Sequence, residues 1–289
     1  MRKALSSFVG ALVFGLIAVV STQAENPKVL RVSAIPDENP QELLRKYEPF
    51  TVYLTKELGI RVEFVPVIDY AATVEGLAAK KLDIVWYGGF TSVQAVRRTG
   101  DKATRLVMRK EDAEFKSVFI TRPGTGIKNL SDLKGRTFAF GSVSSTSGHL
   151  MPRFFLLKNG INPDRDFSQK PAFSGAHDAT ALWVQGGKVD AGALNFLVWE
   201  KLVRTGKVDT NKVHVFWTTP PYVDYVWVAR SAIDPGLRER FSAALLKLRY
   251  DNPKDREIMD LQRTKGFIPA KDEDWKGIED AAKAAGLLK

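Results

Sequence analysis

Apolar runs rich in β-branched and aromatic residues alternate along the chain with stretches in which apolar residues recur at helical spacing. The runs predict strands at 29–33, 62–66, 83–86, 117–121, 137–140, 191–194, 213–217 and 225–229. The intervening stretches predict helices at 41–57, 70–79, 91–98, 148–158, 177–185, 197–204, 235–248, 254–265 and 274–285. This alternation predicts an α/β fold with mostly parallel sheets.

The same order of elements recurs at an offset of 107 residues. At this offset YAATVEGLAAKKLDIVWYGG (70–89) lies over HDATALWVQGGKVDAGALNF (177–196), which pairs Thr73 with Thr180 and Asp83 with Asp190. Any two helix–turn–strand units share part of this pattern, but here a whole β-α-β order repeats. We therefore expect two similar α/β lobes.

The chain beyond the last predicted strand is mostly helical and has no counterpart in the second repeat. We expect it to pack back on the first lobe, which would then comprise residues 25–116 and 219–289, with 117–218 as the second lobe. The chain would cross between the lobes twice. Two crossings form a hinge, and the space between hinged lobes is a usual ligand site.

The N-terminus has the pattern of a secretory signal. Arg2 and Lys3 precede an apolar run at 4–20, and small residues lead to Ala24. A membrane anchor is the alternative, but the densest apolar part, 8–20, is short for a span. We expect residues 1–24 to be cleaved and the mature protein to be periplasmic. The chain has no cysteine, which excludes disulfides and lipid attachment through cysteine.

The chain is basic, with 43 Lys and Arg against 33 Asp and Glu. Removing the signal, which holds two cations and no acid, leaves a net charge of +8. The basic residues are scattered, and an exported protein does not meet nucleic acid, so we expect no nucleic-acid partner. The charge mildly favours anionic ligands.

A cluster of hydroxyls stands in GSVSSTSGHLMP (141–152), between a predicted strand and a predicted helix. In α/β sheets, ligands bind beyond the carboxyl ends of strands, and a helix start offers free N–H groups and a positive dipole end. Together these features suit a small oxyanion. Helix capping is the alternative, but a cap needs only one or two hydroxyls. The candidate ligand-binding residues here are Ser144, Ser145, Thr146 and Ser147.

Other kinds of site are poorly supported by the sequence. It lacks GxxxxGK[ST] and GxGxxG beside these hydroxyls, and STSGH is not GxSxG. The three histidines, His149, His177 and His214, are not paired at metal-ligand spacing. We expect no metal and no cofactor, and a surface or capping role for His149.

Three segments together resemble a known family. DYAATVEGLAAKKLDIVWYG, SVSSTSGHLMP and GAHDATALWVQGGKVDA, in this order, look like the phosphonate/phosphite-type substrate-binding proteins of ABC importers. The resemblance covers nearly the whole mature chain and implies a type II periplasmic binding protein, with two α/β lobes, a hinge and an interlobe ligand cleft. A branch of the family is labelled as selenate-binding, and AIPDENP and EDAEFKSVFIT look closest to that branch.

The resemblance also implies roles for individual residues. The hydroxyls at 145–147, with nearby N–H groups, would hold the anion's oxygens. Tyr87 of WYG would reach in from the first lobe, and His177 of GAHDAT and Asp224 of PPYVDYVWVAR would face the ligand. Their alternative roles are packing for Tyr87, capping for His177 and an exposed strand end for Asp224.

One departure bears on ligand size. Aminoethylphosphonate binders of the family use an acid after the strand that corresponds to 191–194, whereas this chain has Asn195 and no acid before Glu200. A compact anion is therefore expected. The apolar side chains at 196, 197 and 199 either narrow the cavity or pack in the core.

Acidic residues bear on which anion is bound. A buried Asp224 facing an oxyanion needs a proton between the two. Phosphite, phosphate and phosphonates can hold that proton near neutral pH, whereas sulfate and selenate cannot. The repeat places Asp37 and Glu38 opposite 144–147, so they could also face the anion and need a shared proton. Alternatively, they form a solvated helix start.

We therefore expect a monomeric, non-enzymatic periplasmic protein that closes two lobes on a small tetrahedral oxyanion, either phosphite-, phosphonate- or phosphate-like or selenate. It would deliver this anion to an ABC permease in the inner membrane. One alternative is an enzyme on the same fold, for which His177 and Asp178 are the only candidate pair. Another is a sensor module that signals to a membrane receptor.

Overall fold

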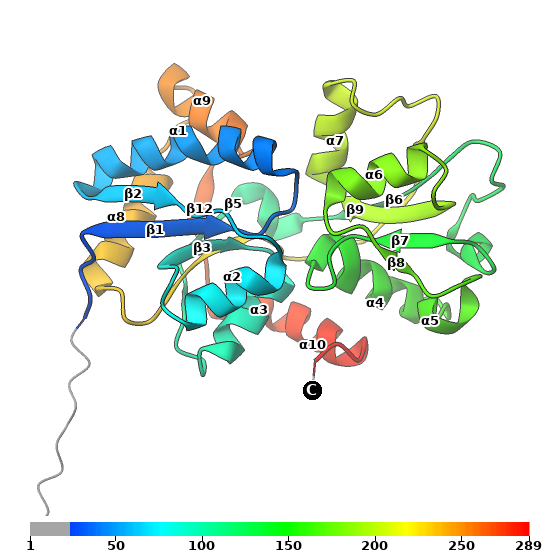
Figure 1. Cartoon of the computed structure of the whole chain (residues 1–289), viewed down its shortest axis with the longest axis horizontal. Coiled ribbons are helices and arrows are strands. Elements are labelled where there is room, and N and C mark those ends of the chain that lie inside the picture. Colours follow the sequence, from blue (N-terminus) through cyan, green and yellow to red (C-terminus); the bar gives the residue numbers. More distant parts are fainter. Residues whose placement is uncertain (1–23, 289) are drawn as a thin grey trace, which may run out of the picture.

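The computed structural model describes residues 24–288, so the predicted signal lies outside the described residues except for Ala24. Two α/β lobes lie side by side, each built on its own five-stranded sheet (Figure 1). Within the described range, no helix combines the length and apolar character that a membrane crossing requires.

The first sheet has the strand order β2-β1-β3-β11-β4. Its strands are β1 (Val29–Ala34), β2 (Arg61–Phe64), β3 (Ile84–Tyr87), β4 (Thr104–Arg105) and β11 (Val226–Ala229). One face carries α1 (Pro40–Leu58), beside which α8 (Pro235–Leu246) and α9 (Pro253–Leu261) pack. The other face carries α2 (Tyr70–Ala78) and α3 (Gly89–Arg98) (Figure 1).

The second sheet has the order β10-β6-β9-β7-β8. Its strands are β6 (Ser117–Thr121), β7 (Phe138–Phe140), β8 (Ala172–Phe173), β9 (Ala191–Asn195) and β10 (His214–Thr218). Helices α6 (His177–Gln185) and α7 (Phe196–Arg204) lie on one side, and α4 (Met151–Lys158) and α5 (Pro163–Asp166) lie on the other (Figure 1).

The expectation of mostly parallel sheets was wrong in part. β1 is parallel to β2 and β3, and β7 is parallel to β8 and β9, but β11 and β6 run antiparallel to their neighbours. β6 and β11 are the strands that follow the two crossings, so each enters its sheet from the other lobe. The short pair β5 (Val107–Arg109) and β12 (Phe267–Pro269) was not predicted, because three residues show no periodicity.

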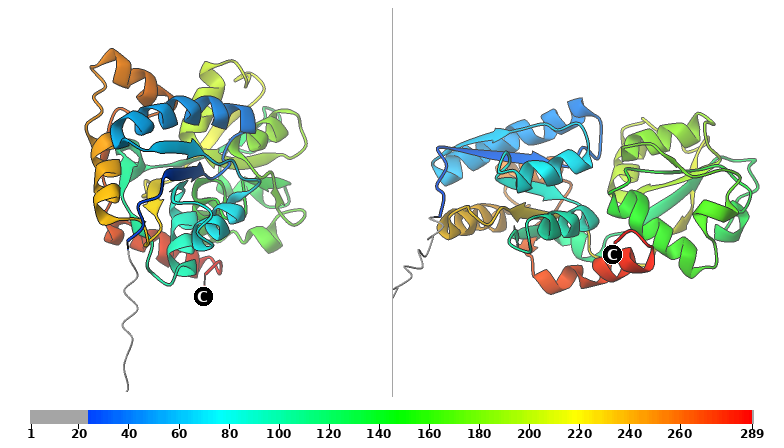
Figure 2. Two further views of the ribbon diagram at one scale, coloured as in Figure 1. Left: turned by 60° about the vertical axis from the view of Figure 1, so that its left-hand side comes forward. Right: turned by 60° about the horizontal axis from the view of Figure 1, so that its bottom comes forward.

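The repeat is visible in the element bounds. Helices α2 and α6, strands β3 and β9, and helices α3 and α7 begin 107 residues apart. The C-terminal part begins with the 3-10 turn η4 (Asp272–Trp275) and continues as α10 (Lys276–Ala284). This helix packs on α3 of the first lobe and also contacts α4 of the second, and Figure 2 shows it running beneath both.

A buried carboxylate joins three strands of the first sheet. Asp83, fully buried before β3, accepts hydrogen bonds from the backbone N–H of Arg31 at 2.8 Å and from its Nε at 3.0 Å. It also accepts one from Nε of Arg230 at 2.8 Å. Asp83 therefore fixes β1, β3 and the end of β11 relative to one another.

Substituting this carboxylate tests its structural role. We expect Asp83→Ala to lower the free energy of unfolding by about 3–5 kcal/mol, because the buried Arg230 would lose its buried partner and keep only Glu25. Urea unfolding of the ligand-free protein measures the change. Glu63→Ala, which removes the exposed Arg61–Glu63 pair, is the matched control and should cost less than about 1 kcal/mol. Equal losses for the two variants would contradict the assignment.

Candidate functional site

The hydroxyl-rich loop leads into a wide helical turn. After β7 the chain forms a loop and then the π-helical turn η3 (Thr146–Leu150), which continues as α4. Pro152 lies in the first turn of α4, where its missing N–H costs no helical hydrogen bond. The N–H groups of Thr146 and Ser147 begin the turn, so they have no acceptor within it and can bind an anion.

The four predicted residues of this loop have different partners. Ser145 caps the turn, because its hydroxyl accepts a hydrogen bond from Gly148 N at 3.0 Å. Thr146 Oγ1 accepts one from Phe90 N at 2.9 Å. Ser144 is half buried and accepts a hydrogen bond from Thr91 through its carbonyl oxygen. The buried Ser147 hydroxyl has no partner among the described residues.

His177 lies against this loop. Its ring occupies the space that a side chain at Gly148 would need, since a Cβ there would stand 3.0 Å from His177 Cε1. His177 Nδ1 accepts a hydrogen bond from Asn195 N at 3.3 Å, so the proton of the neutral ring is on Nε2, which lies 3.4 Å from the Tyr225 hydroxyl. Burial lowers the pKa of His177, which favours this neutral form. The histidine is thus a donor rather than a cation.

Asp224 approaches from the other lobe, where it follows the second crossing. Its Oδ1 accepts a hydrogen bond from Gly89 N at 2.8 Å, at the start of α3, and its Oδ2 has no partner in the described structure. Burial raises the pKa of Asp224 to about 7, although the Gly89 N–H and the nearby Thr146 hydroxyl act in the opposite direction. Near neutral pH this carboxyl can therefore carry a proton on its free oxygen.

Tyr87 does not reach toward the loop, which corrects the prediction. Its hydroxyl donates to the carbonyl oxygen of Thr73 at 2.7 Å, inside the first lobe. Side chains alternate along a strand, and Trp86, the preceding residue, is the one that stacks on Tyr225.

The sequence interpretation missed Tyr70 instead. Tyr70 is buried, and its hydroxyl has no hydrogen-bond partner in residues 24–288. Burial raises its pKa well above the usual value, and the neighbouring Ser145 hydroxyl opposes this. The repeat could have found this residue, because the 107-residue offset pairs Tyr70 with His177.

The other two acidic candidates are already paired. Asp37 accepts a hydrogen bond from the Tyr225 hydroxyl at 3.0 Å. Glu38 accepts from Arg263 at 2.6 Å and from Lys201, on α7 of the second lobe, at 2.7 Å. Glu38 therefore belongs to an ion-pair group that joins the lobes.

The apolar residues after β9 do not narrow the site. Phe196 packs edge-on against Phe115 at 4.9 Å, and with Leu197 it lines a separate pocket of about 630 Å³ beside Arg263. Trp199 is half buried in the core of the second lobe. Packing therefore accounts for all three.

Asn195 places a neutral side chain at the end of the buried strand β9. Its side-chain oxygen caps α7, and its Nδ2 donates to the Tyr225 hydroxyl at 3.0 Å. Arg109, a buried cation of the first lobe, is held by Asp112 through two hydrogen bonds of 2.7 Å. Hydroxyls, N–H groups and one protonatable carboxyl are therefore the candidate ligand-binding groups in this region.

The enzymatic alternative receives no support from the geometry. Asp178 accepts hydrogen bonds from the backbone and side chain of Asn39, both at 3.1 Å, rather than pairing with His177. The surface role expected for His149 was wrong. This histidine is buried, and its Nδ1 donates to Val143 O at 2.7 Å. Across residues 24–288 there is no group of three or more His, Asp or Glu that could hold a metal.

Residues 32–275 match the family described as ABC transporter, phosphonate, periplasmic substrate-binding protein. The chain belongs to this family of binding proteins. The predicted family, the two-lobed fold and the non-enzymatic role in an ABC importer are thereby confirmed.

Individual relatives cover most of this binding protein. A probable ABC transporter phosphite binding protein, PhnD1, from Prochlorococcus marinus (strain MIT 9301) is 39% identical, over 91% of this chain and 92% of its own length. A phosphate-import protein, PhnD, from Mycolicibacterium smegmatis is 29% identical, over 93% of this chain and 90% of its own length. The solved structure of PhnD1 in complex with methylphosphonate matches with a TM-score of 0.86 at 38% identity, over 91% of this chain and 100% of that one.

The raised pKa of Asp224 has a consequence for the stability of the ligand-free binding protein. The folded state holds the proton more tightly than the unfolded state, so Asp224 costs no stability below its ordinary pKa of 3.8 and destabilises the fold progressively as pH rises toward about 7. We expect Asp224→Asn to match the wild type at about pH 4 and to exceed it by about 2–4 kcal/mol at about pH 8. Thermal unfolding across this range measures the difference, and a constant difference would contradict the pKa shift.

Proposed function

We propose that this binding protein captures phosphite, methylphosphonate or phosphate in a form that shares one proton with Asp224, for uptake by an ABC permease. The observation that carries the proposal is the free Oδ2 of a buried carboxyl whose pKa lies at about 7. A fully ionised Asp224 beside a fully ionised oxyanion would place like charges together at low dielectric. A shared proton converts this repulsion into a charge-assisted hydrogen bond.

The remaining oxygens of the anion would be bound by neutral donors. In the proposed site these are the N–H groups of Thr146 and Ser147 and the hydroxyls of Ser147 and Tyr70. Nε2–H of His177 would join them by exchanging its 3.4 Å contact with the Tyr225 hydroxyl for the anion. The unpartnered hydroxyls of Ser147 and Tyr70 support this assignment, because buried polar groups without partners are rare in proteins. Ser145 and Thr146 would shape the turn through the bonds that they already make.

Ligand size follows from the same residues. An aminoalkyl group would need an acceptor for its ammonium group, and the position after β9 is the neutral Asn195. The phosphite and methylphosphonate named for relatives are small anions that carry no ammonium group, so they need no such acceptor.

We further propose that lobe closure completes the site. Bonds already join the lobes at Phe90–Thr146, Thr91–Ser144 and Asn39–Asp178. The lobe boundaries would be those predicted, 25–116 with 219–289 and 117–218. The protein would act in the periplasm as a monomer after cleavage of residues 1–24.

A titration of residues 25–289 tests the proposal. Calorimetry with phosphite, methylphosphonate, phosphate, sulfate and selenate should show tight binding of a phosphorus anion and weak binding of sulfate and selenate. Above about pH 8 the dissociation constant should rise about tenfold per pH unit, because one proton must be taken up on binding. In Asp224→Asn this slope should disappear.

The control variant changes Glu38, an acid that is paired with Arg263 and Lys201, and leaves Asp224 in place. Glu38→Gln removes a charge between the lobes without removing the proposed proton, so its pH slope should equal that of the wild type. Preference for selenate or sulfate, with no pH slope, would contradict the protonated-anion proposal. Absence of binding to all five anions would contradict the proposed ligand class.

A further inference from the structure

Trp275, in the turn before α10, contacts the backbone of Asp224. Its indole Nε1 donates to the Asp224 carbonyl oxygen at 3.0 Å, and the side chain is 1% exposed. Buried Trp86 and Trp227 have no partner for the same indole nitrogen among the described residues. Trp275 therefore makes a specific bond where comparable tryptophans only pack.

This bond completes the fixation of Asp224. The backbone N–H of Asp224 donates to Asp112 O at 3.0 Å, its carbonyl oxygen accepts from Trp275, and its Oδ1 accepts from Gly89 N. Three bonds from three separate segments leave only Oδ2 free. A carboxyl fixed in this way points its remaining oxygen in one direction without the help of a ligand.

The indole also fits against the start of α3. A Cβ at Gly89 would lie 3.3 Å from both Cδ1 and Nε1 of Trp275, closer than most side-chain contacts. The absence of a side chain at Gly89 thus lets the ring lie beside the helix start whose N–H binds Asp224. The same ring touches both the carboxyl's backbone and the helix that holds its Oδ1.

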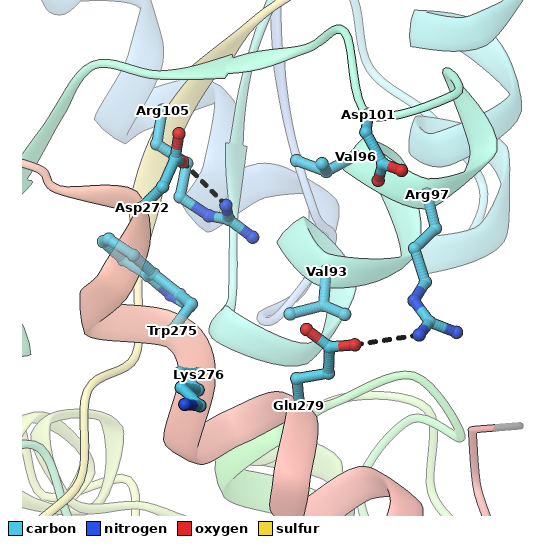
Figure 3. Close-up of a pocket in the computed structure, with 9 residues that line it drawn as sticks. All are labelled: Val93, Val96, Arg97, Asp101, Arg105, Asp272, Trp275, Lys276 and Glu279. Atoms are coloured by element: carbon cyan, nitrogen blue, oxygen red, sulfur yellow. Dashed lines mark hydrogen bonds and ion pairs between the residues drawn. The ribbon is translucent and has the colours of Figure 1, made fainter.

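The outer side of the ring is held by Arg105. The guanidinium group lies 5.1 Å from the ring centroid and donates to Asp272 at 2.9 Å. Figure 3 shows Arg105, Asp272 and Trp275 around a pocket of about 310 Å³ between α3 and α10. Trp275 therefore lines this pocket and also donates a hydrogen bond to Asp224.

We propose that Trp275 is a positioning residue that, through its indole N–H, aims the carboxyl of Asp224 at the bound anion. The inference rests on the proposed function and deepens it, because it places part of the ligand-binding apparatus in the C-terminal segment. Trp275 does not touch the anion. It acts only through Asp224, so its effect on affinity disappears when Asp224 no longer supplies the proton.

The place of Trp275 in the chain gives this positioning a link to both lobes. Trp275 is the N-cap residue of α10, and α10 packs on α3 and contacts α4, the helix that continues the anion-binding turn. One continuous segment, η4 with α10, therefore both contacts the second lobe and bonds to the backbone of Asp224.

A double-mutant cycle tests the inference with methylphosphonate as the probe. Calorimetry at about pH 6 compares the wild type, Trp275→Phe, Asp224→Asn and the double variant. Phenylalanine keeps most of the packing and removes the N–H. We expect Trp275→Phe to weaken binding about tenfold in the wild type and less than about twofold in Asp224→Asn, because mutations that act through one contact are not additive.

Trp227→Phe is the matched control. It makes the same chemical change at a fully buried tryptophan with an unbonded indole N–H, so it should change the dissociation constant less than about twofold. Equal losses for Trp275→Phe in both backgrounds, or no loss in either, would overturn the inference. Absence of phosphorus-anion binding by the wild type would contradict the proposed function. Binding by the wild type without coupling between Trp275 and Asp224 would contradict only this inference.

A measurement on the unmodified protein guards against misfolding of the variant. The indole N–H resonance of Trp275 in nuclear magnetic resonance spectra should shift with pH as Asp224 ionises and shift again when methylphosphonate binds. The Trp227 resonance should respond to neither. A Trp275 resonance that ignores both changes would overturn the inference.

Discussion

A buried carboxyl with one unbonded oxygen is the constraint on which the rest of the site depends. Asp224 is fully buried, its Oδ1 is bonded to Gly89 N, and its Oδ2 has no partner in the described structure. A buried polar atom without a partner is costly, and an ionised one is costlier. In the proposed function the free oxygen holds a proton and shares it with the bound anion.

The remaining groups of the proposed site come from two helix starts. One is the start of α3 in the first lobe, and the other is the π-helical turn η3 of the second lobe. The first helix start binds Asp224 and Thr146, and the second presents its free N–H groups. Helix starts stabilise negative charge, so the proposed anion needs no lysine or arginine beside it. In the proposed site, which has no lysine or arginine at the anion, a second negative charge on the anion would add little binding energy. This agrees with the proposed selection of a protonated anion.

The sequence predicted the elements well where the periodicity was long. α6 and β6 have the predicted bounds, and the hydroxyl cluster lies where strand and helix were expected to meet. Directions of side chains were harder to predict. Tyr87 and Tyr70 are both tyrosines of the first repeat, and the sequence does not show which of them faces the second lobe. In the structure the Tyr87 hydroxyl bonds to Thr73 of α2, inside the first lobe. Trp275 was invisible to sequence patterns, because its bond to Asp224 joins residues 51 positions apart. The antiparallel strands and the ion pairs of Glu38 likewise depend on how the chain crosses between lobes.

The most direct test of this account is a high-resolution structure of the complex with methylphosphonate. We predict that one anion oxygen lies about 2.5–2.7 Å from Asp224 Oδ2, the length of a charge-assisted O–H···O⁻ bond. The Ser147 hydroxyl and the N–H groups of Thr146 and Ser147 should bind the other oxygens. An anion bound elsewhere, or bound here with Asp224 Oδ2 turned away from it, would contradict the central role of the shared proton.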